Sequence, residues 1–142
     1  MRSMHKKLRK QLDEIGKDFE VHILEAALKN DTDNFKVLFE LGNAYTNTGR
    51  YAEGLKIDRR LTQLEPDNPA VHYNLACSLS LVGNLDAAIF SLRRAIELGY
   101  REVDWMREDT DLDNLRTDPR YAELERAAKK QQDDWQRIIA GQ

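Results

Sequence analysis

The chain has 142 residues, of which 41% are hydrophobic and 33% are charged, and its formal net charge is −3. This length predicts a single domain with its own core. The negative charge argues against nonspecific binding to nucleic acid, which needs a basic surface. No segment reaches the ~20 apolar residues of a membrane helix, and the first 12 residues lack the apolar core of a signal peptide. With one cysteine, Cys77, there is no intramolecular disulfide. We therefore expect a soluble, cytoplasmic protein.

Residues 4–29 have the pattern of a long helix. Apolar side chains recur every three or four positions and share one stripe: Met4, Leu8, Leu12, Ile15, Phe19, Ile23 and Ala27. Gly16 is a candidate break between two helices. The basic cluster between Lys6 and Lys10 is interpreted as a solvated face of this helix. We expect the apolar stripe to pack within the chain rather than to form a dimer contact.

Four helices of similar length follow, predicted over 35–48, 51–64, 69–82 and 85–98. Asn34, or its neighbour Asp33, is a candidate N-cap for the first of them. Asn68 is the candidate N-cap of the third, and Pro69 fits its first turn. Gly49 and Gly99 follow helices at positions where glycine easily adopts a positive φ.

The C-terminal part begins with an irregular segment over 100–117. We expect its apolar residues to anchor it: Trp105, Met106, Leu112 and Leu115. Asp118 and Pro119 then start a last helix, by the same cap and proline logic, that ends near residue 139. The stripe of this helix consists of Tyr121, Leu124, Ala128, Gln131, Trp135 and Ile138.

Two segments repeat each other at a spacing of 34 residues. The aligned pairs are Gly42 with Ala76, Gly49 with Gly83, Tyr51 with Leu85, Gly54 with Ala88, and Leu61 with Ala95. A fixed period of this length is typical of stacked units rather than of a closed globule. The small residues at 42, 54, 76 and 88 predict close crossings of the helices within each unit.

These residues resemble the tetratricopeptide repeat (TPR) pattern, a 34-residue helix–turn–helix. Segment 35–68 carries Leu38, Leu41, Gly42, Tyr45, Gly49, Tyr51, Gly54, Leu61 and Pro66, and segment 69–102 carries Leu75, Ala76, Leu79, Gly83, Leu85, Ala88, Leu92 and Ala95. The second segment departs from the pattern at Tyr100, where proline is expected. Residues 18–34 look like the second half of a preceding repeat, and 104–124 resembles a segment that closes bacterial TPR arrays.

The resemblance implies an all-α fold, a TPR-like α-solenoid in which antiparallel helix pairs form a right-handed superhelical stack with capping helices at both ends. It also implies one domain over 1–142. The domain would consist of an N-terminal helix and half-repeat (1–34), two repeats (35–68 and 69–102) and a C-terminal cap (103–142).

The first helix of each repeat lines the partner surface in this family. The inward positions here are Lys36, Phe39, Asn43, Asn47, Tyr73, Asn74, Cys77 and Leu81. Aromatic rings supply contact area, and amides pair with peptide groups, so this mixture suits an extended peptide or a helix. The resemblance therefore implies a non-catalytic adaptor that binds a protein or peptide, without a cofactor, nucleic acid or membrane.

Two other classes of function stay open. The terminal helices could form a homodimer, or the acidic segment 104–118 could bind a small molecule or metal. Asp109, Asp111 and Asp113 resemble the start of a calcium loop, but Asn114 and Arg120 replace its glycine and glutamate. We expect no metal there and no catalytic residues anywhere in the chain.

A chaperone-tail clamp is a further alternative within the family. Asn43 and Asn74 match its pattern, but Phe39 stands in place of a lysine, and Asp104 and Glu108 stand where cations are required. The charge-assisted bonds of such a clamp are missing.

Overall fold

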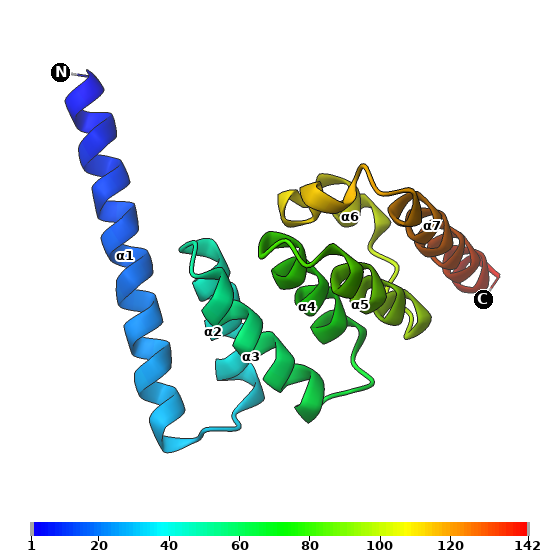
Figure 1. The fold of residues 1–142 in the computed structure, drawn as a ribbon, viewed down its shortest axis with the longest axis horizontal. Helices are drawn as coiled ribbons and strands as arrows, with labels where there is room; N and C mark the ends of the chain where they lie inside the picture. Colours follow the sequence, from blue (N-terminus) through cyan, green and yellow to red (C-terminus); the bar gives the residue numbers. More distant parts are fainter. Residues whose placement is uncertain (1, 142) are drawn as a thin grey trace. The chain divides into compact units, whose positions relative to one another are not determined.

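The regular structure is helical throughout the described residues of the computed structural model, which are residues 2–141, with side chains from residue 4. The elements are α1 (Arg2–Asn30), α2 (Phe35–Asn47), α3 (Tyr51–Leu64), α4 (Pro69–Leu81), α5 (Leu85–Glu97), α6 (Val103–Glu108), the 3₁₀ helix η1 (Thr110–Leu115) and α7 (Pro119–Ala140) (Figure 1). None of these helices is long and apolar enough to cross a membrane.

The bounds of α2 to α5 agree with the predicted ranges to within one residue. Two expectations were wrong. Gly16 does not break α1, which runs continuously through it, because the residues on both sides favour the helix strongly enough to carry one glycine. Residues 100–117 are not irregular throughout, because α6 and η1 lie within them.

The residues expected to start helices act as N-caps. The side chain of Asn34 accepts a hydrogen bond from the backbone N–H of Val37 at 3.1 Å, and Asn68 accepts one from Ala70 at 2.9 Å. The side chain of Asp118 caps α7 in the same way. Each of these bonds satisfies a backbone donor that the first helical turn leaves free.

Three helices end in the same left-handed turn, at Gly49, Gly83 and Gly99, with φ of 79°, 84° and 106°. In each turn the next backbone N–H bonds to a carbonyl five residues earlier: Arg50 to Tyr45, Asn84 to Leu79 and Tyr100 to Ala95. This is the Schellman pattern, which needs a residue that tolerates a positive φ. The predicted role of Gly49 and Gly99 is confirmed.

The chain forms two compact units, Met1–Ile57 and Asp58–Gln142, and the boundary lies within α3. In the first unit, Val21 on α1 packs with Leu41, Ala44 and Tyr45 on α2. The Tyr45 hydroxyl donates to Glu25 Oε1 at 2.8 Å and thereby joins the same two helices. Burial and the Glu25 carboxylate raise the pKa of Tyr45 to about 12, so the phenol stays protonated.

Gly54 lies where α2 and α3 cross, as its position in the repeat predicts. A Cβ atom at Gly54 would lie 3.0 Å from Thr46 Oγ1, 3.5 Å from the Gly42 carbonyl oxygen and 3.6 Å from Tyr45 Cβ. The absence of a side chain at 54 therefore allows the close approach of these helices.

In the second unit, the segment 103–115 packs through η1 on α4 and α5 and through α6 on α7. Its buried apolar residues are Val103, Met106, Leu112 and Leu115. Trp105 is a correction to the predicted anchors: its side chain is exposed because it lies outside the side of α6 on which Val103 and Met106 are buried. On α7, Tyr121, Leu124 and Ala128 are buried, whereas Trp135 and Ile138 further along the predicted stripe are exposed.

Candidate partner-binding surface

One face of α2 carries four of the predicted partner-binding residues. Lys36, Phe39, Asn43 and Asn47 follow one another at intervals of three or four positions and therefore share one side of the helix. Lys36 and both asparagines are exposed, whereas Phe39 is half-buried and its ring stacks on Phe35 at 6.0 Å. Among the described residues, no side chain pairs with either amide. This face thus offers an apolar ring, two free amides and one positive charge.

Asn47 also lines an open hollow of about 330 Å³ within the first unit. The other lining residues are Glu14, Lys17 and Asp18 on α1, and Thr48 after α2. Charged and polar groups dominate this lining, so the end of the α2 face adjoins a polar recess rather than an apolar pocket.

The corresponding positions on α4 are not open. Tyr73 and Cys77 are 4% and 6% exposed, because the segment 103–115 covers them. The Tyr73 hydroxyl donates to Asp109 Oδ2 at 2.6 Å, and its ring stacks on Tyr100 at 4.3 Å. Cys77 Sγ lies 3.6 Å from the same Asp109 oxygen. Asn74 and Leu81, the other two predicted residues of this helix, are half-buried.

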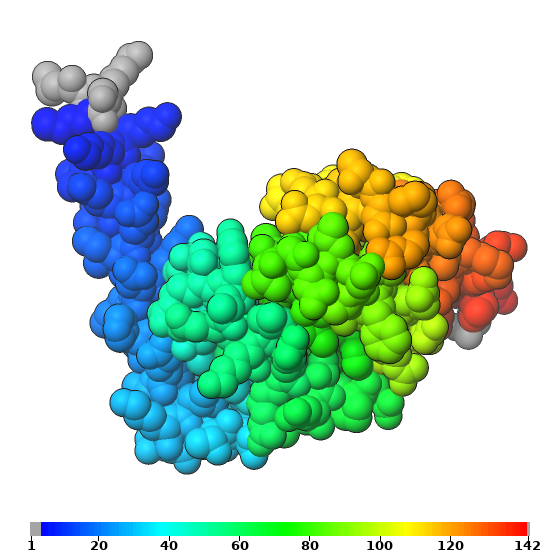
Figure 2. All heavy atoms as spheres, viewed as in Figure 1, coloured from blue at the N-terminus to red at the C-terminus, as the bar shows by residue number. Residues whose placement is uncertain are grey.

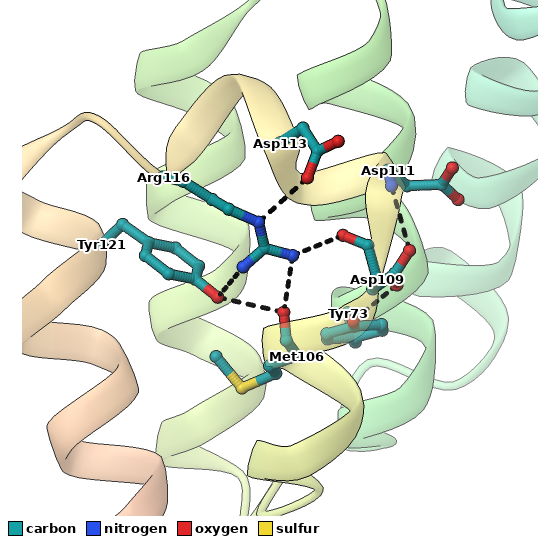
Figure 3. A network of polar contacts seen from close by, with 7 residues as sticks. All are labelled: Tyr73, Met106, Asp109, Asp111, Asp113, Arg116 and Tyr121. Carbon is teal, nitrogen blue, oxygen red and sulfur yellow. Dashed lines mark hydrogen bonds and ion pairs between the residues drawn. The ribbon is translucent and has the colours of Figure 1, made fainter.

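Arg116 holds the closing segment, residues 103–115, in place (Figure 3). Arg116 Nη2 donates to the carbonyl oxygens of Met106 at 3.0 Å and Asp109 at 2.7 Å, and Nε donates to Asp113 Oδ1 at 2.9 Å. Its Nη1 donates to the Tyr121 hydroxyl at 2.9 Å. One guanidinium therefore connects α6, η1 and α7, and these bonds satisfy carbonyl groups at the end of α6 that the helix itself leaves free.

Cys77, Asp109 and Asp111 place three potential metal ligands within 4.8 Å of one another. Protein donors already occupy this group, however. Asp109 Oδ2 accepts from Tyr73 and Cys77, and Oδ1 accepts from the backbone N–H of Asp111 at 3.0 Å. Burial and the nearby Asp109 raise the pKa of the Cys77 thiol well above its usual range, which keeps the thiol protonated. Since a metal needs the thiolate, the cluster is better suited to holding the covering segment.

The remaining acids of the proposed calcium-like stretch also have structural partners. The Asp113 carboxylate pairs with Arg116, and Asp109 caps η1. Arg120 binds Asp118 and Asp86 instead of lying near Asp109. Asp104 and Glu108 are exposed on α6, so no cation takes the place that a chaperone-tail clamp would require.

Sequence reasoning identified the closing segment but missed the residues that hold it. Asp109 and Tyr73 are 36 positions apart, and the bond between them has no local signal. The position of Tyr73 in the repeat could have indicated this contact. A tyrosine at an inward position must either face a partner or be covered by the segment that follows the last repeat.

The repeats also match known proteins. A family model described as "Tetratricopeptide repeat" matches residues 35–68 and 69–98. The chain is 28% identical over 78 residues to a chloroplastic protein of Arabidopsis thaliana, a match that covers 53% of this chain and 23% of that protein. The chain thus corresponds to less than a quarter of the length of this relative.

Solved structures show the same fold. A crystal structure of MamA superposes with a TM-score of 0.66 at 21% identity, covering 84% of this chain and 70% of that chain. A second structure, titled "MamA MSR-1 C2", gives 0.65 at 22% identity, with 84% and 69% covered. The two matched repeats, the glycine turns that end their helices and the similarity to these structures all indicate the same repeat fold. Residues 35–98 of this chain therefore consist of two tetratricopeptide repeats, which support a protein–protein interaction module.

Proposed function

We propose that this chain is a non-catalytic adaptor of the cytoplasm and that it binds a peptide segment or partner helix on the exposed face of α2. The observation that carries the proposal is the set of unengaged groups on that face. Asn43 and Asn47 each offer an N–H₂ donor and a carbonyl acceptor, which can pair with the backbone of an extended peptide. Phe39 offers apolar contact beside them.

The charge of the α2 face also indicates which charge its ligand should carry. Lys36 is exposed near the start of α2, and its ammonium group would favour an acidic residue in the partner. The best ligand is therefore an extended segment with one apolar side chain for Phe39 and one acidic side chain toward Lys36.

The α4 residues contribute differently. Asn74 and Leu81 are half-buried and can add contacts. Tyr73 and Cys77 are covered by the chain's own segment 103–115, so binding through them would first require that segment to leave α4. The proposal consequently does not depend on Tyr73 or Cys77.

The test is a selection of displayed random peptides against the wild-type protein and against a variant with Asn43→Arg and Asn47→Arg. Both positions are exposed, so this variant should fold, which a thermal melt verifies. The matched control carries Lys56→Ala and Arg59→Ala, two exposed residues of α3. We expect a consensus peptide that binds the wild type and the control but loses about tenfold or more in affinity for the α2 variant. Equal binding to all three proteins would refute the α2 face as the site.

A further inference from the structure

An apolar stripe of exposed side chains runs along α1 and has no role in the proposed function. Its six side chains are between 52% and 67% exposed: Met4, Leu8, Leu12, Ile15, Phe19 and Ile23. The expectation that this stripe packs within the chain was therefore wrong. Figure 2 shows the first turns of α1 extending beyond α2, without neighbours from the first unit. A continuous apolar surface of this length is unusual on a soluble protein and marks an interaction site.

Contacts within the first unit use the other side of the same helix. Val21, Leu24 and Leu28 pack against α2. At 100° per residue, these three positions lie on the side of α1 opposite the stripe. The helix therefore has two apolar sides in its C-terminal half, and only one of them is used within its unit.

The spacing of the stripe has a specific form. The intervals between its residues are 4, 4, 3, 4 and 4, so each of Met4, Leu8 and Leu12 recurs eleven positions later. An eleven-residue repeat corresponds to about 3.67 residues per turn, close to the natural 3.6, and the stripe stays on one side over about 29 Å. The intervals also read the same in both directions. If a second copy of α1 lies antiparallel, Met4 faces Ile23, Leu8 faces Phe19 and Leu12 faces Ile15.

The charges on α1 favour the same arrangement. Between residues 4 and 12 the charged residues are all basic: Lys6, Lys7, Arg9 and Lys10. Between residues 13 and 25 five are acidic and one is basic: Asp13, Glu14, Lys17, Asp18, Glu20 and Glu25. An antiparallel copy sets the basic half against the acidic half, whereas a parallel copy would set like charges side by side.

The residues beside the stripe make this complementarity specific. By helical position, Arg9 and Glu20 border the stripe on one side, and Lys7 and Asp18 border it on the other. A two-fold axis between antiparallel helices brings Arg9 of one copy next to Glu20 of the other, and Lys7 next to Asp18, about 3 Å apart along the axis. Each pair occurs twice by symmetry. Within the described residues, none of these four side chains forms an ion pair in its own chain.

We propose that two copies of this chain associate through α1, with the helices antiparallel and the six-residue stripe of each buried against that of the other. This interface is isologous, because the same surface is used by both partners, and it closes at two copies. It uses neither the α2 face nor α4, so it is independent of the adaptor function proposed above.

The first test is the mass of the full chain in solution, by light scattering during gel filtration at about 100 μM, a concentration that populates even a micromolar dimer. We expect twice the 16.5 kDa of one chain. Phe19→Glu should give the monomer mass. Phe90→Glu is the matched control, because Phe90 is an exposed phenylalanine on α5 (70%, against 66% for Phe19) outside the stripe. Its mass should stay at that of the dimer. A monomeric wild type, or a dimeric Phe19→Glu variant with normal helix content, would overturn the proposal.

The second test addresses the orientation. Arg9→Glu should raise the dimer dissociation constant by about tenfold or more, since it sets two acids together on each side of the axis. Adding Glu20→Arg to the same chain should restore the wild-type constant. The control Lys10→Glu changes the charge on the side of α1 away from the stripe and should have little effect. Failure of the double variant to recover would reject the antiparallel pairing.

Cysteine cross-linking provides a readout that does not depend on affinity. A chain with both Arg9→Cys and Glu20→Cys should form a disulfide-linked dimer on mild oxidation, and neither single variant should. A parallel pairing would instead cross-link a Leu8→Cys chain to itself. The native Cys77 is buried and does not interfere.

Discussion

The hydroxyl of Ser78 on α4 donates a 2.5 Å hydrogen bond to the carboxylate of Asp58 on α3, and both side chains are buried. Asp58 occupies the repeat position that Leu92 holds 34 residues later, where the second repeat buries an apolar side chain. An acid thus lies in a core position of the fold, where it accepts a hydrogen bond from the Ser78 hydroxyl.

This acid should make the stability of the protein depend on pH. Burial raises the pKa of Asp58 from 3.8 to about 6, against the smaller opposing effect of the Ser78 bond. The folded state therefore holds the proton more tightly than the unfolded state, and the free energy of unfolding falls as the pH rises from about 4 to about 6. The full difference corresponds to about 3 kcal/mol, which is lost at pH 7.

Asp58→Asn removes this titration and keeps an acceptor for Ser78. We expect the variant to be more stable than the wild type at pH 7, by about 1–3 kcal/mol, and the gap to close toward pH 4. Urea unfolding of both proteins at several pH values measures the difference between their free energies of unfolding. The titration of other groups is common to both proteins and cancels in this difference. A gap that does not change with pH would contradict the raised pKa.

Tyr73→Phe should weaken the attachment of the closing segment to α4. The change removes the donor that lies 2.6 Å from the buried Asp109 carboxylate and leaves that oxygen with the weaker Cys77 thiol. We expect a loss of about 1–3 kcal/mol in the free energy of unfolding. Tyr51→Phe is the control, because Tyr51 is exposed and its hydroxyl has no partner in the described part of the chain. Equal stability of the two variants would show that the Asp109 bond contributes nothing.

Gly54→Leu should destabilise the first repeat. A Cβ at this position already meets Thr46 at 3.0 Å and the Gly42 carbonyl oxygen at 3.5 Å, so larger side chains force α2 and α3 apart. We expect a loss of about 1–3 kcal/mol and a lower melting temperature in circular dichroism. Gly16→Ala provides the opposite case: nothing lies within 4 Å of its Cβ position, and alanine favours the helix by up to about 1 kcal/mol. If Gly54→Leu melted at the wild-type temperature, Gly54 would not lie at a close helix crossing.

The reactivity of Cys77 should report departure of the closing segment from α4. The thiol is 6% exposed and its pKa is raised by burial and by Asp109, so a thiol reagent should modify the native protein slowly. Arg116→Ala removes the bonds to the Met106 and Asp109 carbonyls and should speed the labelling by about tenfold or more, since each lost bond costs about 1 kcal/mol. Arg126→Ala, an exposed change on α7, should leave the rate unaltered. Equal rates in all three proteins would mean that Arg116 does not hold the segment.

The features that the sequence predicts well are those decided by neighbours in the chain. Asn34 and Asn68 cap helices, and Gly49 reverses the chain, because each acts on backbone groups within five residues of itself. Gly54 could also be placed, since the 34-residue period fixes which positions meet at a crossing.

Burial is harder to predict, because it depends on segments far away in the chain. The α1 stripe has the spacing of a buried helix face, and Trp105 is a large apolar residue, yet the side chains of both are exposed. Conversely, the sequence predicts Tyr73 to be an open partner position, but the helical segment 103–115 covers it. A repeat pattern gives the position of a residue within its unit, but not which other segment takes the neighbouring place.

The covering of α4 also limits how the protein can polymerise. An uncovered last repeat could receive the first helices of another molecule, and such head-to-tail contacts add subunits without end and build fibres. Here Leu112 and Leu115 fill the apolar surface, while Asn114 Nδ2 donates to the Ser80 carbonyl oxygen at 2.9 Å and occupies an acceptor at the end of α4. Growth from this end would require the closing segment to be displaced first, so the protein carries its own barrier to filament formation.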